Sequence, residues 1–139
     1  MPTCSRHSKA PLNKAGATFE IVAPTIAGVQ ASDGSWIDAD QMIDGGPSVL
    51  YDAVAILPAA AAMSDLLLES AARDFLADAF AHCKFIGFTS GAIPLLAKAG
   101  VDPAADEGLI ALGDSKSIDG FITSCRKLRL WARESSVKL

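Results

Sequence analysis

The sequence predicts an α/β fold with a mainly parallel, doubly wound sheet. Short apolar runs of strand length alternate with amphipathic helical patterns, which is typical of that class. Two of the runs, 52–57 and 85–88, are apolar on both faces, as in strands that helices cover from both sides. The first run stops at Pro58 and the second at Thr89-Ser90-Gly91. A chain of 139 residues is long enough for one domain with a sizeable core.

The sequence of residues 1–49 predicts only short secondary-structure elements. An alternating stretch rich in β-formers ends at Pro24 and predicts a strand. Asp33-Gly34 supplies the positive φ angles of a tight hairpin turn, and Gly16 is the expected stop of a helix. In order, the expected elements are an unstructured tail (1–8), the last turns of a helix (9–15), a strand (18–23), a hairpin (28–38) and a loop (39–49).

The remaining residues predict strands and helices in alternation. Ser70 is the expected cap of a helix whose apolar residues recur at three- and four-residue steps up to Cys83. A second amphipathic pattern near the carboxyl end leaves Leu130 and Trp131 off its apolar face. The expected elements are a strand (52–57), a short helix (63–68), a helix (70–83), a strand (85–88), a helix (91–99), a strand (109–112) and a helix from Ser115 or Ser117 to Ala132. The expected apolar face of that last helix consists of Ile118, Phe121, Ile122, Cys125, Leu128 and Ala132.

One strand of a doubly wound domain is missing from this pattern. Such a domain begins with a strand that lies inside the sheet, followed by its helix. Here no apolar β-run precedes the expected helix end at 9–15. Either the chain lacks its first, innermost strand or another segment fills that position. In the first case the flanking strands 18–23 and 52–57 would expose unpaired backbone.

Composition argues against several classes of partner. The net charge of −4 disfavours a nucleic-acid surface, and no apolar run approaches the roughly 20 residues of a membrane span. The start of the chain has no signal-peptide pattern, and nothing in the sequence indicates a compartment. The three cysteines contain no C-x-x-C pair and the two histidines have no ligand-like spacing, so we expect no metal site and no cofactor in this segment.

One basic cluster stands out on the predicted last helix. Arg126, Lys127 and Arg129 lie close together there, followed by Trp131. Such a cluster is more often a solvated face or a subunit contact than an anion site. A tryptophan off the apolar face hints at a contact with another domain or subunit. We therefore predict these four residues to be an interface.

Five stretches of the chain carry a family resemblance: 46–57, 81–86, 106–110, 129–134 and the hairpin 31–40. Their order and spacing resemble the C-terminal domain of large-subunit catalases, over about residues 10–134. The resemblance implies a flavodoxin-like domain, related in fold to class I glutamine amidotransferase-like proteins. It also implies a haem catalase core upstream that works as a homotetramer. We expect this domain to occupy 9–134, with tails at 1–8 and 135–139.

The turn after strand 85–88 is where this fold would carry a nucleophile. Catalytic relatives of the fold have a Cys at this elbow, tuned by a nearby His or acidic group. This chain has Thr89 followed by Ser90, and the acidic partner would come from the missing first strand. The glycine pair that can form an oxyanion hole is Ala59-Ala60 here. We therefore interpret Thr89 and Ser90 as turn and cap residues and expect no catalytic residue.

Three functions compete at this stage. The first is a non-catalytic accessory domain of a large-subunit catalase, with the core and neighbouring subunits as partners and haem only in the parent. The second is a holdase-like or self-associating module that uses the exposed strand edges. The third is a relict hydrolase based on Ser90 with a base such as Asp114, which is more simply a helix-entry residue. A redox role for Cys83 or Cys125 is weaker, since both lie on predicted buried faces.

Overall fold

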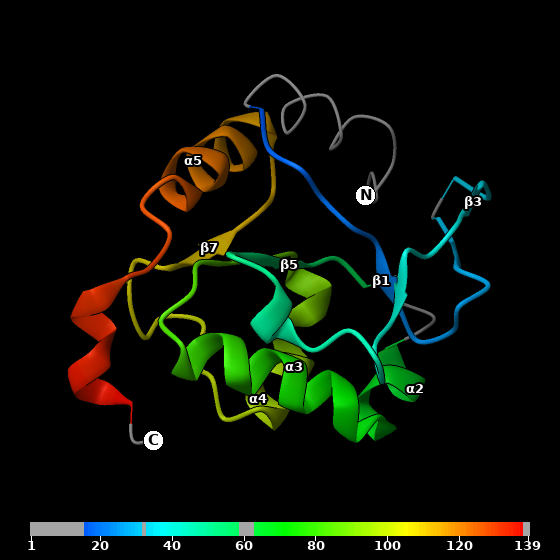
Figure 1. Cartoon of the computed structure of the whole chain (residues 1–139), viewed down its shortest axis with the longest axis horizontal. Helices are drawn as coiled ribbons and strands as arrows, with labels where there is room; N and C mark the ends of the chain where they lie inside the picture. The colour runs from blue at the N-terminus through cyan, green and yellow to red at the C-terminus, as the bar shows by residue number, and fades with distance from the viewer. Residues whose placement is uncertain (1–15, 32, 59–62, 138–139) are drawn as a thin grey trace.

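The computed structural model describes residues 16–31, 33–58 and 63–137. A parallel sheet lies in the middle, with α2, α3 and α4 on one side and α5 on the other (Figure 1). Helices thus cover both faces, and the predicted α/β, doubly wound architecture is confirmed. The expected tail at 1–8 and helix end at 9–15 lie outside the described residues.

The sheet has three strands in the order β5-β6-β7, all parallel. Val54 of β5 pairs with Ile86 of β6, which in turn pairs with Leu109 of β7. All three residues of β6 are buried, as the doubly apolar run predicted. The strand bounds are β5 (Val54–Ile56), β6 (Ile86–Phe88) and β7 (Leu109–Ala111).

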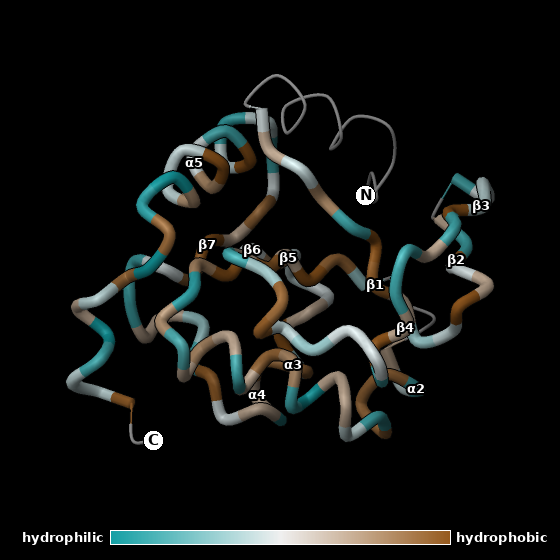
Figure 2. Tube along the Cα trace, in the orientation of Figure 1, coloured by the Kyte–Doolittle hydropathy of each residue, from teal (hydrophilic) through white to brown (hydrophobic). Residues whose placement is uncertain are grey.

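The larger part of the core fills the space between this sheet and three helices. Their bounds are α2 (Met63–Leu68), α3 (Ser70–Ala81) and α4 (Ile93–Lys98). Leu76 and Leu96 are fully buried there against Ile86 of the sheet. Figure 2 shows the hydrophobic residues gathered along β5, β6 and β7, with the hydrophilic ones toward the periphery. The helices form because their apolar residues recur at the helical period and can be buried together.

The opposite face of the sheet carries a smaller core under α5 (Ser115–Cys125). Phe121 of α5 packs there with Phe85 and Leu130. Gly87 makes this packing possible, since a Cβ built on it would lie 2.8 Å from Leu112 Cδ1 and 3.2 Å from Phe121 Cε2. A glycine in the middle of β6 therefore sets how closely α5 approaches the sheet.

Replacing Gly87 with valine should push α5 away from the sheet. Overpacking of a filled core lowers the free energy of unfolding by about 1–3 kcal/mol. Urea denaturation of the variant and the wild type measures this difference. Gly120→Ala is the matched control, because Gly120 is a helical glycine with no atom near its Cβ position. Gly120→Ala is expected to raise the free energy of unfolding by up to about 1 kcal/mol, because alanine has the higher helix propensity. A Gly87→Val protein as stable as the wild type would contradict this packing.

The segment before β5 is only partly as predicted. The hairpin at 28–38 is confirmed as β2 (Val29–Gln30) paired antiparallel with β3 (Trp36–Ile37). The strand predicted at 18–23 shrinks to β1 (Val22–Ala23). The loop prediction for 39–49 is wrong, because it contains β4 (Gln41–Met42), which pairs parallel with β1, and part of a 3₁₀ helix, η1 (Ser48–Leu50). Two-residue strands of mixed polarity are too short to show a period in the sequence.

No described strand pairs with the outer edge of β5. Within residues 16–31, 33–58 and 63–137, β5 pairs with β6 alone, and β1 pairs with β4 in a separate sheet. Ala55, at the centre of β5, is exposed, although β5 reads as a buried inner strand in the sequence. This arrangement fits the prediction that the first, innermost strand is missing from the described sheet.

Two helix predictions need correction. Glu69, not Ser70, is the residue before α3, and no side chain caps this helix, which ends at Ala81 rather than at Cys83. The last helix ends at Cys125 instead of continuing to Ala132. The chain turns at Leu128, whose φ is +65°, and a 3₁₀ helix, η4 (Trp131–Ser136), follows.

Tertiary contacts explain why the last helix stops early. The Leu130 N–H donates to the Cys83 carbonyl, with N and O 2.7 Å apart, and the Leu130 side chain is buried. Leu128, predicted on the buried face, is instead 54% exposed. Packing of Leu130 and of the residues after it therefore overrides the helical period of the sequence.

Candidate functional site

The strand-to-helix elbow lies at the carboxyl end of β6. Thr89 is extended, and η3 (Ser90–Ala92) leads directly into α4. The Thr89 N–H donates to the Ile56 carbonyl, with N and O 3.2 Å apart, which ties the elbow to β5. The geometry is thus the turn that the sequence predicted, although the Thr89 side chain makes no capping hydrogen bond.

The elbow hydroxyls have no base in hydrogen-bond contact within the described part of the chain. Thr89 is half-buried and Ser90 is exposed. Asp114, the candidate base, caps α5 instead: its Oδ1 accepts from the Ser117 N–H at 2.7 Å, and Ser117 Oγ accepts from the Asp114 N–H at 3.1 Å. Hydrogen bonding from the Ser117 backbone N–H first, and then from the Ser117 side chain, lowers the pKa of Asp114. The Ala59-Ala60 pair lies outside the described residues.

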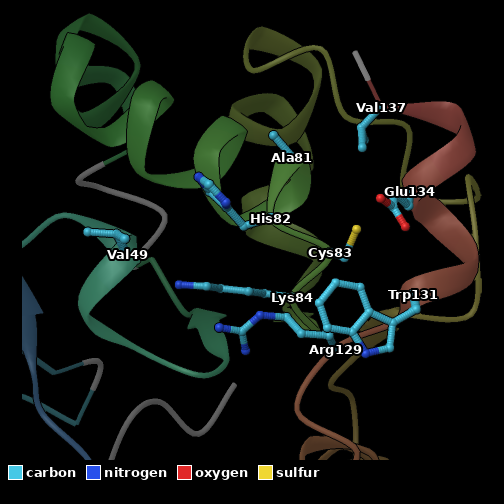
Figure 3. A pocket seen from close by; sticks show the side chains of 9 residues that line it. All are labelled: Val49, Ala81, His82, Cys83, Lys84, Arg129, Trp131, Glu134 and Val137. Atoms are coloured by element: carbon cyan, nitrogen blue, oxygen red, sulfur yellow. The ribbon is translucent and has the colours of Figure 1, made fainter. Parts of the chain in front are cut away.

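A pocket of about 400 Å³ lies at the other end of β6, next to its amino end. We call it the β6 pocket (Figure 3). It is formed by the connection from α3 to β6, by η1 and by the segment around η4. Its lining residues are Val49, Ala81, His82, Cys83, Lys84, Arg129, Trp131, Glu134 and Val137.

Two cations lie side by side in the β6 pocket. Figure 3 shows the side chains of Lys84 and Arg129 extending in the same direction, away from the indole of Trp131. Only 1% of Lys84 is exposed, and its Nζ donates to the Ser48 carbonyl. Burial first, and then the charge of Arg129, lower the pKa of Lys84, and the carboxylates of Asp52 and Asp78 partly offset this effect. Among the described residues, Lys84 forms no ion pair with a carboxylate.

The Arg129 side chain is less buried than that of Lys84, with 25% of it exposed. Its Nη1 donates to the Asp52 carbonyl at 3.1 Å and to its neighbour's, Leu128, at 2.9 Å. The Asp52 carboxylate is 3.9 Å away and 78% exposed, which makes it a weak, solvent-screened partner. The positive charge at this end of the pocket is therefore only partly neutralised.

The four residues predicted as an interface separate in the structure. Arg126 and Lys127 are exposed in the turn after α5, not on a helix. Arg129 and Trp131 line the β6 pocket, where Trp131 is 67% exposed. Sequence reasoning missed Lys84, although a lysine directly before an entirely apolar strand was a signal of a buried charge.

Arg133 is a second charge that the sequence reasoning missed. Its guanidinium is fully buried and forms two hydrogen bonds with Asp106, Nε to Oδ2 at 2.6 Å and Nη2 to Oδ1 at 2.9 Å. Nη1 donates to the carbonyls of Phe80 and Lys84. Arg133 thereby fastens η4, which carries Trp131 and Glu134, to the elements that form the rest of the pocket.

The Asp106 carboxylate should make the free energy of unfolding depend on pH in the acidic range. Arg133 holds the pKa of Asp106 below its ordinary value of 3.8. A carboxylate whose pKa is lower in the folded state than in the unfolded state stabilises the protein at pH values above the unfolded-state pKa. This stabilisation is lost as the pH falls through the folded-state pKa. Urea denaturation from about pH 5, where the contribution is present, down to about pH 2, well below the ordinary value, should therefore show a smaller loss of stability for Asp106→Asn than for the wild type. Equal losses would contradict the ion pair.

The two cysteines in the described part of the chain, Cys83 and Cys125, are not exposed nucleophiles. Cys83 lines the β6 pocket but is only 3% exposed, and its φ is +61°. Burial raises the pKa of Cys125 to about 11, so little thiolate forms near neutral pH. Across the described residues, no three His, Cys, Asp or Glu side chains come together in a way that could hold a metal ion. The same residues contain no helix that is both long and apolar enough to span a bilayer.

Comparison with known families identifies the chain. The model of the "C-terminal domain found in long catalases" matches residues 4–135, nearly the whole length. The chain belongs to this catalase C-terminal domain family. The resemblance noted in the sequence is therefore confirmed.

Individual relatives agree with the assignment to the catalase C-terminal domains. Catalase C of Rhizobium meliloti is 55% identical over 130 residues, which is 94% of this chain and 18% of the relative. Catalase HPII of Pseudomonas putida is 29% identical over 85% of this chain and 16% of its own length. The chain thus spans less than a fifth of the length of these relatives.

A solved structure supports the fold. Schizosaccharomyces pombe DJ-1 superposes with a TM-score of 0.66 over 94% of this chain and 87% of that one, at 11% identity. The catalase C-terminal domain therefore has the flavodoxin-like, class I glutamine amidotransferase-like fold that the sequence predicted. At this identity the likeness concerns fold alone.

Proposed function

We propose that this chain is a non-catalytic accessory domain of a large-subunit haem catalase. In this role it packs on the catalase core and on neighbouring subunits, stabilises the assembly and shapes access to the haem channel. Membership of the catalase C-terminal domain family over residues 4–135 is the observation that carries the proposal. We assign the domain to 9–134, with 1–8 and 135–139 as flanking tails.

The chemistry of peroxide dismutation is assigned to the part of the relatives that this chain does not match. A haem needs an axial ligand and largely apolar walls around the porphyrin. The β6 pocket does not fit that requirement, because Lys84, Arg129 and Glu134 line it. At the elbow, Ser90 has no hydrogen-bonded base among the described residues, and a serine needs one to become a nucleophile.

A chimera tests this proposal. The present chain replaces the matching 130 residues of Catalase C from Rhizobium meliloti and is compared with the same enzyme lacking the domain. Without the domain, we expect faster heat inactivation and a changed dependence of turnover per haem on peroxide concentration. If peroxide kinetics and heat inactivation were both unchanged by the deletion, the accessory role would be wrong.

The relict hydrolase is tested on the same chain. A fluorophosphonate probe and simple esters should give no labelling and no turnover. Labelling that disappears in Ser90→Ala would overturn the non-catalytic assignment. Asp114→Asn is the companion variant, because labelling that depends on Asp114 would identify the base.

A holdase or interaction role is the second candidate, and the outer edge of β5 is the observation that favours it. That edge has no partner strand among the described residues, and Ala55 at its centre is exposed. Open edges accept strands from other chains. Soluble chain at stoichiometric amounts would then suppress aggregation of a denaturing client protein. No suppression would count against this role.

A further inference from the structure

The β6 pocket contains a buried ammonium that forms no direct ion pair among the described residues. Lys84 is 1% exposed, yet its ammonium contacts only the Ser48 carbonyl and no carboxylate among the described residues. Buried charges in proteins are normally paired, because taking an ammonium out of water is costly. Arg129 beside it adds positive charge. Two such cations facing a pocket favour an anionic group from outside the domain.

The side chains around these two cations are better suited to binding a protein segment than a free anion. The rim carries exposed apolar side chains, with Trp131 at 67% and Val49 at 62%. Leu50, which follows Val49 in the chain, is 61% exposed, and Leu128, which precedes Arg129, is 54% exposed. Tryptophan and arginine are the residues most enriched where protein interfaces gain their affinity. Glu134 lines the pocket as well and disfavours a highly charged anion such as phosphate.

The pocket is also rigidly held before any partner binds. Arg133 fixes η4 through Asp106 and through the carbonyls of Phe80 and Lys84, so Trp131 projects from an anchored segment. Residues held in place lose less freedom on binding, which favours recognition.

We propose that the β6 pocket docks a carboxylate-bearing, apolar-flanked segment of the catalase core, with the carboxylate received by Arg129, the apolar flank by Trp131, and the buried charge of Lys84 adding to the attraction. This inference rests on the proposed accessory function and names the surface through which it acts. The weak pairing of Arg129 with the exposed Asp52 is easily exchanged for the partner's carboxylate.

The test uses the chimera with Catalase C, with and without Lys84→Met and Trp131→Ala. Docking is read from hydrogen exchange of residues 129–137 and from the rate at which heated enzyme loses its subunit contacts. Each variant is expected to speed that loss at least about tenfold, because an interfacial partner charge or aromatic anchor is removed. In the isolated chain, Lys84→Met should keep or raise the stability to urea, since it removes a buried unpaired ammonium.

Matched controls lie away from the β6 pocket. Trp36→Ala removes an equally exposed tryptophan, 59% against 67%, and Lys116→Met removes an exposed lysine at the start of α5. Both should leave docking unchanged. If Lys84→Met and Trp131→Ala also leave docking unchanged while deletion of the domain destabilises the enzyme, the docking inference fails and the accessory function stands.

Two other outcomes would also overturn the inference. If deletion of the whole domain has no effect on the enzyme, the proposed function fails and the docking inference falls with it. If the isolated chain self-associates in light scattering and Trp131→Ala abolishes this, the pocket binds a second copy of the domain rather than the core.

Discussion

Replacing Arg133 with alanine is expected to lower the free energy of unfolding by about 3–5 kcal/mol. The side chain is completely buried, and its removal takes from the Asp106 carboxylate the two hydrogen bonds that Arg133 donates. The carbonyls of Phe80 and Lys84 lose a donor as well. The guanidinium also lies 4.4 Å from the centroid of the Phe80 ring, a contact that alanine cannot make.

The geometry of the guanidinium matters as well as its charge. Arg133→Lys keeps the charge but cannot form the two-pronged contact with Asp106, so most of the loss should remain. Arg73→Ala is the control, because Arg73 pairs with Asp74 at the surface, where the side chains are 46% and 60% exposed. That change should cost less than about 1 kcal/mol in urea denaturation. A comparable small cost for Arg133→Ala would contradict the structure.

Replacing Phe121 with alanine is the second large effect, at about 3 kcal/mol or more. Phe121 is the buried residue of α5 and packs with Phe85 and Leu130 in the smaller core. Because no other α5 side chain is buried among the described residues, we expect α5 to open locally before the rest of the domain. Hydrogen exchange should then show α5 amides unprotected while α3 stays protected.

An exposed apolar residue provides the comparison for Phe121. Leu68 in α2 is 82% exposed, and Leu68→Ala should change stability by no more than about 0.5 kcal/mol. Equal protection of α5 and α3 in Phe121→Ala would show that α5 is held by contacts other than this side chain.

Sequence patterns predicted the sheet and its helices well, for a physical reason. The predicted strands at 52–57, 85–88 and 109–112 and the predicted helices at 63–68 and 70–83 are long or apolar enough for burial to determine their structure. The predicted end of the last helix was wrong because Leu130 and Arg133 form hydrogen bonds with distant parts of the chain. The helical periodicity of the sequence carries no information about such contacts.

The candidate site was less predictable than the fold. Arg129 and Trp131 were found as interface candidates, but their neighbour in space, Lys84, is 45 positions earlier than Arg129 in the chain. Arg133 reads as an ordinary surface arginine in the sequence, and only the position of Asp106 explains its burial. Pairings between distant charged residues leave no periodic signal.

The temperature at which the catalase assembly dissociates tests the central claim most directly. The chimera of this chain with the Catalase C core and the same core without the domain are compared by light scattering during heating. The accessory role predicts that the core without the domain dissociates at a clearly lower temperature, with its haem content per subunit unchanged beforehand. The same dissociation temperature for both proteins would contradict the account.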